Sequence, residues 1–268
     1  MHWVNGKLSS SISVMDRSFQ YGDGCFTTML VFEGKIQHWD MHVKRMEECL
    51  HFLNIALPNW EKVYKWLMEA RLKNRKSGLK LHITRGKGHF GYNSQGIESP
   101  NITISHFLVP NHYKRLIRYG LELGVCNQNL GINPLLAGYK HNNRLEQVLL
   151  KLEINRLGLF DAIVLDIKKN LIETTIANLF WVKNNIIYTP SLENAGVNGI
   201  TRQLVIQFSS SKNLKLIIDN FQFQCLDDAE EIFITNSILG VVPVIKIISK
   251  HYNIGKVTRY FQERLNPC

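Results

Sequence analysis

Residues 137–144 read Ala137-Gly138-Tyr139-Lys140-His141-Asn142-Asn143-Arg144 and lead directly into a helical pattern. By residue type alone, a lysine is most often a solvated surface residue. Here Lys140 stands among small and amide side chains, and a neighbouring cation such as Arg144 disfavours the charged form of an amine. A neutral lysine amine is a nucleophile towards an aldehyde. The stretch is therefore a candidate site for covalent attachment of a carbonyl compound.

Another glycine-bearing turn, Tyr21-Gly22-Asp23-Gly24, stands just before an expected strand. It is not a phosphate loop, because it lacks the GxxxxGK spacing and no helix follows it. Two interpretations stay open for this turn. It is either a strand entry that needs an unusual backbone or part of a functional site.

Residues 195–202, Ala195-Gly196-Val197-Asn198-Gly199-Ile200-Thr201-Arg202, run into a further helix. Backbone N–H groups at a helix start, with the hydroxyl of Thr201 beside them, form a natural phosphate site. Without further context, an ordinary helix cap at Asn198 or Thr201 is the commoner case. Earlier in the chain, Glu173 stands in apolar company, and a buried carboxylate has to be paired or to take part in chemistry.

Strands and helices mix along the chain without a regular βαβ repeat, which favours an α+β fold. Hairpins are expected at Asn5-Gly6, Glu33-Gly34 and Asn184-Asn185. Further strands are expected at 79–84, 102–109, 121–125, 162–165, 214–218 and 231–235. Helices are expected from Asp40, which can cap the first one, and then over 59–73, around 145–152, from 199 and over 256–265.

A polar, proline-containing segment at 110–114 separates two parts of the chain. We therefore expect a smaller N-terminal α/β domain over residues 1–112 and a larger C-terminal domain over residues 113–268, which the resemblance described below implies to be the cofactor-binding domain. The 268 residues suffice for two modest domains, and an apolar content of 45% allows a sizeable core.

The composition also narrows the class of protein. The N-terminus lacks the layout of a signal peptide, and no apolar run is long enough to span a bilayer, so we expect a cytoplasmic protein without a membrane segment. Five scattered cysteines, Cys268 among them, argue against a disulfide framework and a cysteine metal site. The net charge of +10 admits a nucleic-acid partner, but the basic residues form no long tract.

The order of these features resembles the motif series of fold-type IV pyridoxal-phosphate enzymes. The series comprises Tyr21-Gly22-Asp23-Gly24, Arg45, Lys140, Glu173-Thr174 with Asn178-Leu179-Phe180, and Asn198-Gly199-Ile200-Thr201-Arg202. It runs over nearly the whole chain. The resemblance implies a two-domain fold whose C-terminal domain is barrel-like, pyridoxal 5'-phosphate as cofactor, a homodimer, and no metal.

The resemblance also implies roles for individual residues. Lys140 would bind the cofactor covalently and act as the base, and Glu173 would face the pyridine nitrogen of the cofactor. Its phosphate would be held by Arg45, Ile200, Thr201 and Ser237. Thr28 would assist an elimination. Arg85 is a candidate for a substrate carboxylate, with a surface arginine about equally expected at this position.

Within the family, two branches compete. The stretches Gly22-Asp23-Gly24-Cys25-Phe26-Thr27-Thr28 and 138–147 are most similar to aminodeoxychorismate lyases, whereas branched-chain aminotransferases usually carry Phe-Glu-Gly in place of Phe26-Thr27-Thr28. The lyase resemblance implies conversion of 4-amino-4-deoxychorismate into 4-aminobenzoate and pyruvate in folate biosynthesis. A D-amino-acid or branched-chain aminotransferase is the alternative. A basic nucleic-acid-binding protein is a remote one that rests on charge alone.

Overall fold

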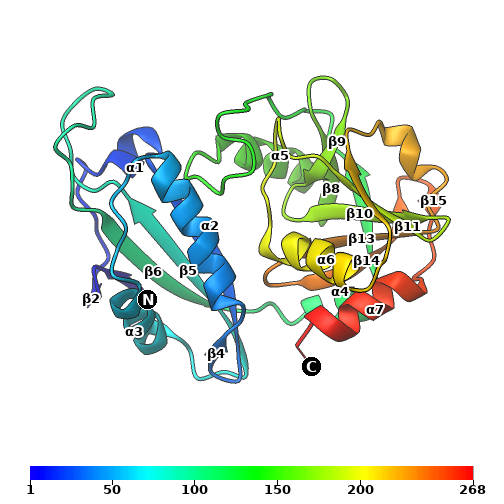
Figure 1. Cartoon of the computed structure of the whole chain (residues 1–268), viewed down its shortest axis with the longest axis horizontal. Helices are drawn as coiled ribbons and strands as arrows, with labels where there is room; N and C mark the ends of the chain where they lie inside the picture. The colour runs from blue at the N-terminus through cyan, green and yellow to red at the C-terminus, as the bar shows by residue number, and fades with distance from the viewer. Residues whose placement is uncertain (268) are drawn as a thin grey trace. The chain divides into compact units, whose positions relative to one another are not determined.

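The computed structural model describes residues 1–267, so Cys268 lies outside the described residues. The chain divides into two compact units (Figure 1). The first comprises Met1–Val109 and Tyr139–Arg144, and the second comprises Pro110–Gly138 and the chain from Leu145 onwards. The sequence predicted domains at 1–112 and 113–268, and the observed units differ from these in one respect that matters for function. The segment that carries Lys140 groups with the N-terminal unit.

An antiparallel six-stranded sheet in the order β2-β1-β6-β5-β3-β4 forms the first unit. Its strands and helices are β1 (His2–Val4), β2 (Lys7–Leu8), α1 (Arg17–Tyr21), β3 (Gly24–Phe32), β4 (Lys35–Ile36), α2 (Trp39–Phe52), α3 (Trp60–Ala70), β5 (Lys76–Thr84) and β6 (Asn101–Leu108). The expected hairpins form here because Asn5-Gly6 and Glu33-Gly34 all take positive φ, as tight two-residue turns require.

Strand β3 shows why the sheet has two different faces. Cys25, Thr27, Met29 and Val31 are buried, and the apolar members pack in one core with residues of α2 and α3. Of the alternate residues, Phe26, Thr28 and Phe32 are only partly buried, whereas Leu30 is 5% exposed. The period of two in a strand therefore puts Thr27 and Thr28 on opposite faces.

Asp40 does not cap the helix that follows, so that prediction is wrong. The N-cap position of α2 is His38 in the left-handed conformation, without a side-chain cap, and Asp40 lies in the first turn. Its negative charge still complements the positive end of the helix dipole there.

A nine-stranded sheet forms the second unit, and six of its strands close into a barrel. The path runs β10-β13-β14-β7-β8-β9, and β9 then pairs with β10 through Glu173 and Asn178. These strands are β7 (Leu121–Val125), β8 (Asp161–Leu165), β9 (Leu171–Thr174), β10 (Asn178–Lys183), β13 (Glu231–Asn236) and β14 (Gly240–Ile247). The expected α+β, barrel-like fold is confirmed.

The remaining elements surround the barrel. They are α4 (Tyr113–Tyr119), α5 (Leu145–Arg156), β11 (Ile186–Pro190), α6 (Ile200–Ser211), β12 (Leu216–Asp219), the 3₁₀ turn η1 (Phe223–Leu226), β15 (Lys250–His251) and α7 (Lys256–Leu265). Figure 1 shows α6 and α7 close together, with α7 also packed on β13 and β14. No helix among residues 1–267 has the length and apolarity needed to cross a membrane.

Helix α5 has an apolar face outside the core. Leu150 and Ile154 are buried, whereas Leu145 is 71% exposed and Val148, Leu149 and Leu152 are about half exposed. Since these four residues lie three or four apart, they form one apolar stripe along the helix. We call residues Leu145, Val148, Leu149 and Leu152 the α5 stripe.

Candidate active site

The segment Tyr139–Arg144, which carries Lys140, pairs with the edge of β3 and so extends the sheet of the first unit. The Phe26 amide donates to the Lys140 carbonyl at 3.0 Å, and the Asn142 amide donates to the Gly24 carbonyl at 2.9 Å. A β-bridge between Cys25 and His141 lies between these bonds. Lys140 is therefore fixed by backbone pairing, opposite Phe26.

The geometry at Gly24 explains why a glycine stands at the start of β3. Its φ is +155°, and a Cβ there would lie 2.3 Å from the Ile83 carbonyl oxygen. Any side chain at Gly24 would therefore displace β3 from β5 at the point where the Lys140 segment joins the sheet. The structure supports the interpretation of this turn as a demanding strand entry next to the candidate site.

Arg144 holds the turn around Lys140 in place. Its Nε donates to the His141 carbonyl at 2.9 Å, and its Nη2 donates to the Tyr139 carbonyl at 2.7 Å. The guanidinium thus bonds the carbonyl groups on both sides of the lysine. This positioning role was not visible in the sequence, where Arg144 counted only as a neighbouring charge.

Two lysines approach one aromatic ring on the partly buried face of the sheet. The Nζ atoms of Lys140 and Lys80 each lie 4.7 Å from the centre of the Phe26 ring. Thr28 is directly opposite Lys80 in the β3–β5 register, so it faces the same side. Burial lowers the pKa of Lys80, and burial together with Lys80 lowers the pKa of His82 to about 4. This face combines cations, hydroxyl groups that include Thr28, and a neutral imidazole.

Arg45 lies on the other face, within a buried chain of hydrogen bonds. Its Nη2 donates to Thr27 Oγ1 at 2.5 Å, and Thr27 Oγ1 lies 2.6 Å from His42 Nδ1. Burial and the nearby Arg45 charge hold the pKa of His42 well below its usual value. His42 is therefore neutral, and the Thr27 hydroxyl can donate to Nδ1 while it accepts from Arg45.

One atom of this buried guanidinium has no partner in the chain. Arg45 is 6% exposed, and its Nε makes no hydrogen bond. Burial lowers the pKa of Arg45 to about 10, which leaves it a cation at neutral pH. A buried cation with a spare donor suits an anion such as a phosphate. Thr27 and His42, which the sequence did not single out, orient the Arg45 guanidinium.

Glu173 is the buried carboxylate of the second unit. Its Oε2 accepts from the Val197 amide at 3.1 Å and lies 3.3 Å from Asn178 Nδ2. Asn178 Nδ2 also donates to the Val197 carbonyl at 2.8 Å. These N–H donors favour the ionised carboxylate, which is the form that would face a protonated pyridine nitrogen. The three residues join β9, β10 and the loop before α6.

The start of α6 lies beside the same residues. Gly199 is its N-cap and provides no side-chain cap, while Ile200 and Thr201 are 1% and 6% exposed. A Cβ on Gly199 would lie 2.2 Å from Asn178 Oδ1, so only glycine lets the helix start this close to β10. Neither Asn198 nor Thr201 caps the helix. A buried helix start without a side-chain cap is suited to bind an anion.

Ser237 follows directly after β13, at the end where Thr235 pairs with Asn178. It is partly buried. Thr235 is 1% exposed, and its Oγ1 has no hydrogen-bond partner. The end of β13 therefore carries a buried hydroxyl without a partner at Thr235, two residues before Ser237 in the chain.

Arg85 has a structural role that the substrate interpretation did not anticipate. It is 7% exposed, and its guanidinium bonds both Asp23 oxygens and the carbonyls of Leu53 and Asn54 at 2.6–3.1 Å. Asp23 also pairs with Arg17 at 3.0 Å. These partners occupy most of the donors of Arg85, so we do not assign it to a substrate carboxylate.

No cluster of three or more histidine, cysteine, aspartate or glutamate side chains suited to a metal ion occurs in residues 1–267.

Comparison with known proteins identifies the relatives of the chain. The family model described as amino-transferase class IV matches residues 24–247. An aminodeoxychorismate lyase from Vibrio harveyi is 46% identical over 99% of this chain and 100% of its own length. An aminodeoxychorismate lyase from Bacillus subtilis is 27% identical, covering 94% of this chain and 88% of its own.

Solved structures agree with these relatives. The crystal structure of 4-amino-4-deoxychorismate lyase from Pseudomonas aeruginosa superposes with a TM-score of 0.91 at 32% identity, covering 98% of this chain and 97% of the other. The branched-chain aminotransferase of Escherichia coli has a TM-score of 0.86 at 20% identity, covering 98% of this chain and 92% of its own. The second likeness shows the shared fold alone.

Proposed function

Because the chain belongs to the class IV aminotransferase family, we propose that it is a lyase converting 4-amino-4-deoxychorismate into 4-aminobenzoate and pyruvate, with pyridoxal 5'-phosphate as cofactor. The observation that carries the proposal is the 46% identity to an aminodeoxychorismate lyase over essentially both full lengths. The Thr27-Thr28 pair, where branched-chain aminotransferases usually have Glu-Gly, also favours this branch.

The cofactor supplies an electron sink when it is bound. Lys140 would hold it covalently, and Glu173 would keep the pyridine nitrogen protonated. Arg45, the α6 start at Ile200 and Thr201, and Ser237 would hold the phosphate. The spare Nε of Arg45 and the uncapped, buried start of α6 both suit such a group.

Lys140 would also act as the base of the reaction. Its amine has to be neutral to take the proton from the substrate carbon that bears nitrogen. Lys80 lies over the same Phe26 ring, and its charge disfavours a second ammonium nearby. We assign the two lysines different roles, Lys140 as the base and Lys80 as a cation for the substrate.

Thr28 would protonate the departing enolpyruvyl oxygen. The C–O bond breaks with its electron pair on that oxygen, the Thr28 hydroxyl would pass a proton to it and regain one from the protonated Lys140 amine, and the released enol tautomerises to pyruvate. The ring left behind becomes aromatic, which supplies driving force. Lys80, opposite Thr28, takes the place of Arg85 as our candidate for a substrate carboxylate.

An aminotransferase of the same family is the second candidate, because removal of the first proton is common to both reactions. The test is to incubate the purified holoenzyme with 4-amino-4-deoxychorismate and follow pyruvate and 4-aminobenzoate in equal amounts. An amino-acid/keto-acid exchange assay runs on the same sample. Fast exchange without pyruvate release would replace the lyase with the aminotransferase.

Lys140→Ala provides the control for this assay. The variant should lose covalent cofactor binding and turnover together, because it lacks both the attachment point and the base. Turnover at the wild-type rate would overturn the role of Lys140.

We further propose a homodimer in the cytoplasm. The α5 stripe supports a second copy as its partner, since an exposed apolar stripe of this kind is typical of an interface. The free thiols of Cys25, Cys49, Cys126 and Cys225 suit a reducing compartment. Sedimentation of wild type against Val148→Glu/Leu152→Glu tests the dimer, which the charges should dissociate.

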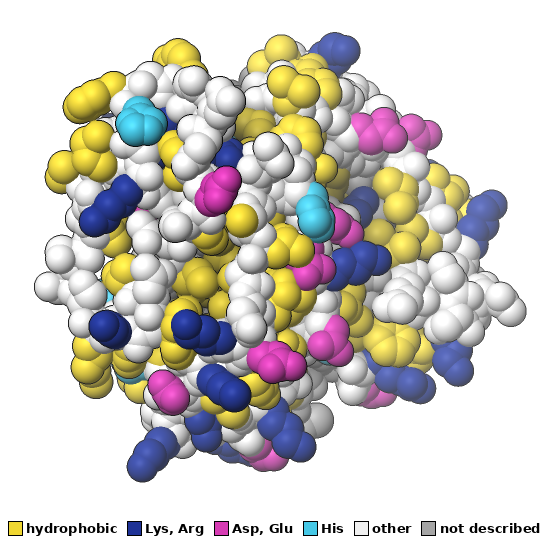
Figure 2. Space-filling view, turned by 60° about the vertical axis from the view of Figure 1, so that its left-hand side comes forward, with side chains coloured by type: hydrophobic (Ala, Val, Ile, Leu, Met, Phe, Trp, Pro, Cys, Tyr) yellow, Lys and Arg dark blue, Asp and Glu magenta, His cyan; other side chains and the backbone are white. Residues whose placement is uncertain are grey.

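A nucleic-acid partner is not part of the proposal. On the face seen in Figure 2, the basic side chains are interspersed with acidic and apolar ones. Binding to nucleic acid depends on a coherent basic surface.

A further inference from the structure

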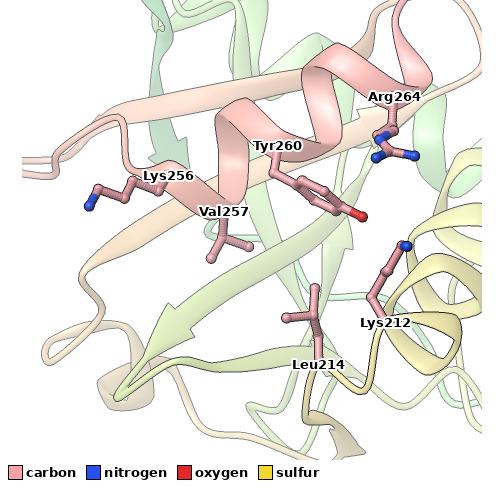
Figure 3. A pocket seen from close by; sticks show the side chains of 6 residues that line it. All are labelled: Lys212, Leu214, Lys256, Val257, Tyr260 and Arg264. Atoms are coloured by element: carbon pink, nitrogen blue, oxygen red, sulfur yellow. The ribbon is translucent and has the colours of Figure 1, made fainter.

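A pocket of about 410 Å³ lies in the second unit between the end of α6 and α7 (Figure 3). Leu214, Val257 and the ring of Tyr260 give it apolar walls. The other lining residues are all cations, namely Lys212, Lys256 and Arg264. The pocket therefore combines an apolar interior with positive charge and has no acidic lining residue.

A buried hydroxyl marks one end of this pocket. Tyr260 Oη is shielded from solvent and has no hydrogen-bond partner. Figure 3 shows the side chains of Lys212 and Arg264 directed towards that hydroxyl, whereas Lys256 points away from it. A buried hydroxyl without a partner is destabilising, and in native proteins a water molecule or an ion can supply the missing hydrogen bond.

The cations at this end are not neutralised by the protein. No ion pair of Lys212, Lys256 or Arg264 occurs within residues 1–267, although Lys246 and Lys183 elsewhere in the second unit do form ion pairs. The Arg264 guanidinium lies 5.3 Å from the centre of the Tyr260 ring, which restricts its position. Single solvated cations are common on surfaces. Lys212 and Arg264 are themselves exposed, but they converge on one hydroxyl and so offer an anion two cationic partners.

We propose that this pocket binds a small aromatic carboxylate. Its carboxylate would lie between the exposed side chains of Lys212 and Arg264, which would move apart to let it accept a hydrogen bond from Tyr260, while its ring would contact Leu214 and Val257. An inorganic anion would satisfy the cations but leave the apolar walls uncovered, so the organic ligand fits the whole lining.

The pocket is separate from the candidate active site. Lys212 follows the last residue of α6, and Thr201 stands in its first turn. Twelve helical residues at about 1.5 Å each put roughly 18 Å between the two ends of α6. 4-Aminobenzoate belongs to the proposed ligand class. The assignment nevertheless does not rest on the proposed function, because it is tested with benzoate, which the proposed reaction neither consumes nor forms.

Calorimetric titration of the cofactor-loaded enzyme with benzoate tests the site. Wild type should bind benzoate, and Lys212→Met/Arg264→Gln should weaken that binding at least about tenfold, since it removes both charge-assisted partners. Tyr260→Phe, which keeps the ring, should weaken it about fivefold through the lost hydrogen bond. Lys168→Met removes an exposed lysine elsewhere in the second unit and should leave benzoate binding unchanged.

The alternatives give different results in the same experiment. Benzoate affinity that is equal in wild type and in both pocket variants would overturn the site, even if benzoate binds in the active site. Equal competition by inorganic phosphate would show an unspecific anion site and would overturn the aromatic ligand. Circular dichroism of Tyr260→Phe confirms that the variant is folded.

Discussion

Arg45 Nη2 donates to Thr27 Oγ1, so the first hydroxyl of the Thr27-Thr28 pair serves the arginine on the helix-covered face of the sheet. The second hydroxyl faces the opposite side, where Lys140 and Lys80 approach Phe26. Two adjacent threonines therefore belong to two different parts of the proposed reaction. Their variants should separate cofactor binding from elimination.

Thr27→Val should weaken cofactor binding by about tenfold, because Arg45 and His42 both lose a buried partner, a loss of about 1–3 kcal/mol. Turnover at saturating cofactor should stay near wild type. Titration of the apoenzyme with pyridoxal phosphate, followed by absorbance, measures the effect. Thr27→Ser retains the hydroxyl and should restore the affinity. Equal affinity in Thr27→Val and wild type would remove Thr27 from the phosphate site.

Thr28→Ala should bind the cofactor normally and release pyruvate about 10²-fold more slowly, the low end of what a positioned proton donor contributes. Single-turnover pyruvate release, recorded beside cofactor absorbance, measures both quantities. Thr28→Ser is the matched control and should retain most of the rate. Elimination at the wild-type rate in Thr28→Ala would return Thr28 to an ordinary strand residue.

Glu173→Gln should still bind the cofactor but lose most of its activity, because an amide does not stabilise a protonated pyridine as a carboxylate does. The amide oxygen can still accept from the Val197 amide, so the loop before α6 should stay in place. The measurement is kcat at saturating cofactor, with the thermal midpoint as a check on folding. An unchanged kcat would make Glu173 a purely structural residue.

Lys80→Met should raise the KM for 4-amino-4-deoxychorismate about tenfold or more, since it removes the cation opposite Thr28. The methionine preserves the apolar contact with Phe26, so the fold should tolerate the change. Steady-state kinetics at several substrate concentrations separate KM from kcat. A KM equal to that of wild type would show that the substrate carboxylate binds elsewhere.

Arg85→Gln should act on stability rather than on substrate binding. Removal of one partner from a buried ion pair costs about 3–5 kcal/mol, moderated here because Asp23 keeps Arg17. Urea unfolding of the variant should show the loss, while the KM of the folded fraction stays near that of wild type. A stable variant with a strongly raised KM would reinstate Arg85 as a substrate ligand.

Local patterns in the sequence predicted much of this fold. The Asn-Gly, Glu-Gly and Asn-Asn turns need positive φ, and that requirement depends on neighbouring residues only. Strand β9 was not predicted, because four residues, Leu171–Thr174, are too few to show a period and all four are buried. The cap of α2 was also misplaced, since His38 takes the left-handed conformation that residue type favours only weakly.

The candidate site shows the same limit. Lys140, Arg45 and Glu173 could be named from motif order, because each stands in a distinctive stretch. The partners Thr27, His42 and Arg144 could not be assigned, since their roles depend on which strand face or carbonyl they meet after folding. Arg85 was ambiguous for the same reason. From the sequence alone, an arginine that belongs to a buried hydrogen-bond network cannot be distinguished from one that binds a substrate.

The closure of the barrel has a consequence for how the second unit unfolds. Strand β9 meets β10 at the pair Glu173–Asn178, and the same two side chains join the loop before α6. The closure of the barrel and the carboxylate that we propose to face the cofactor ring therefore depend on the same two residues. If the pairing of β9 with β10 opens, the Glu173 carboxylate leaves its position. A ligand that binds this carboxylate would therefore stabilise the closed barrel. Amide protons along β9 and β10 then report cofactor occupancy through their exchange with solvent.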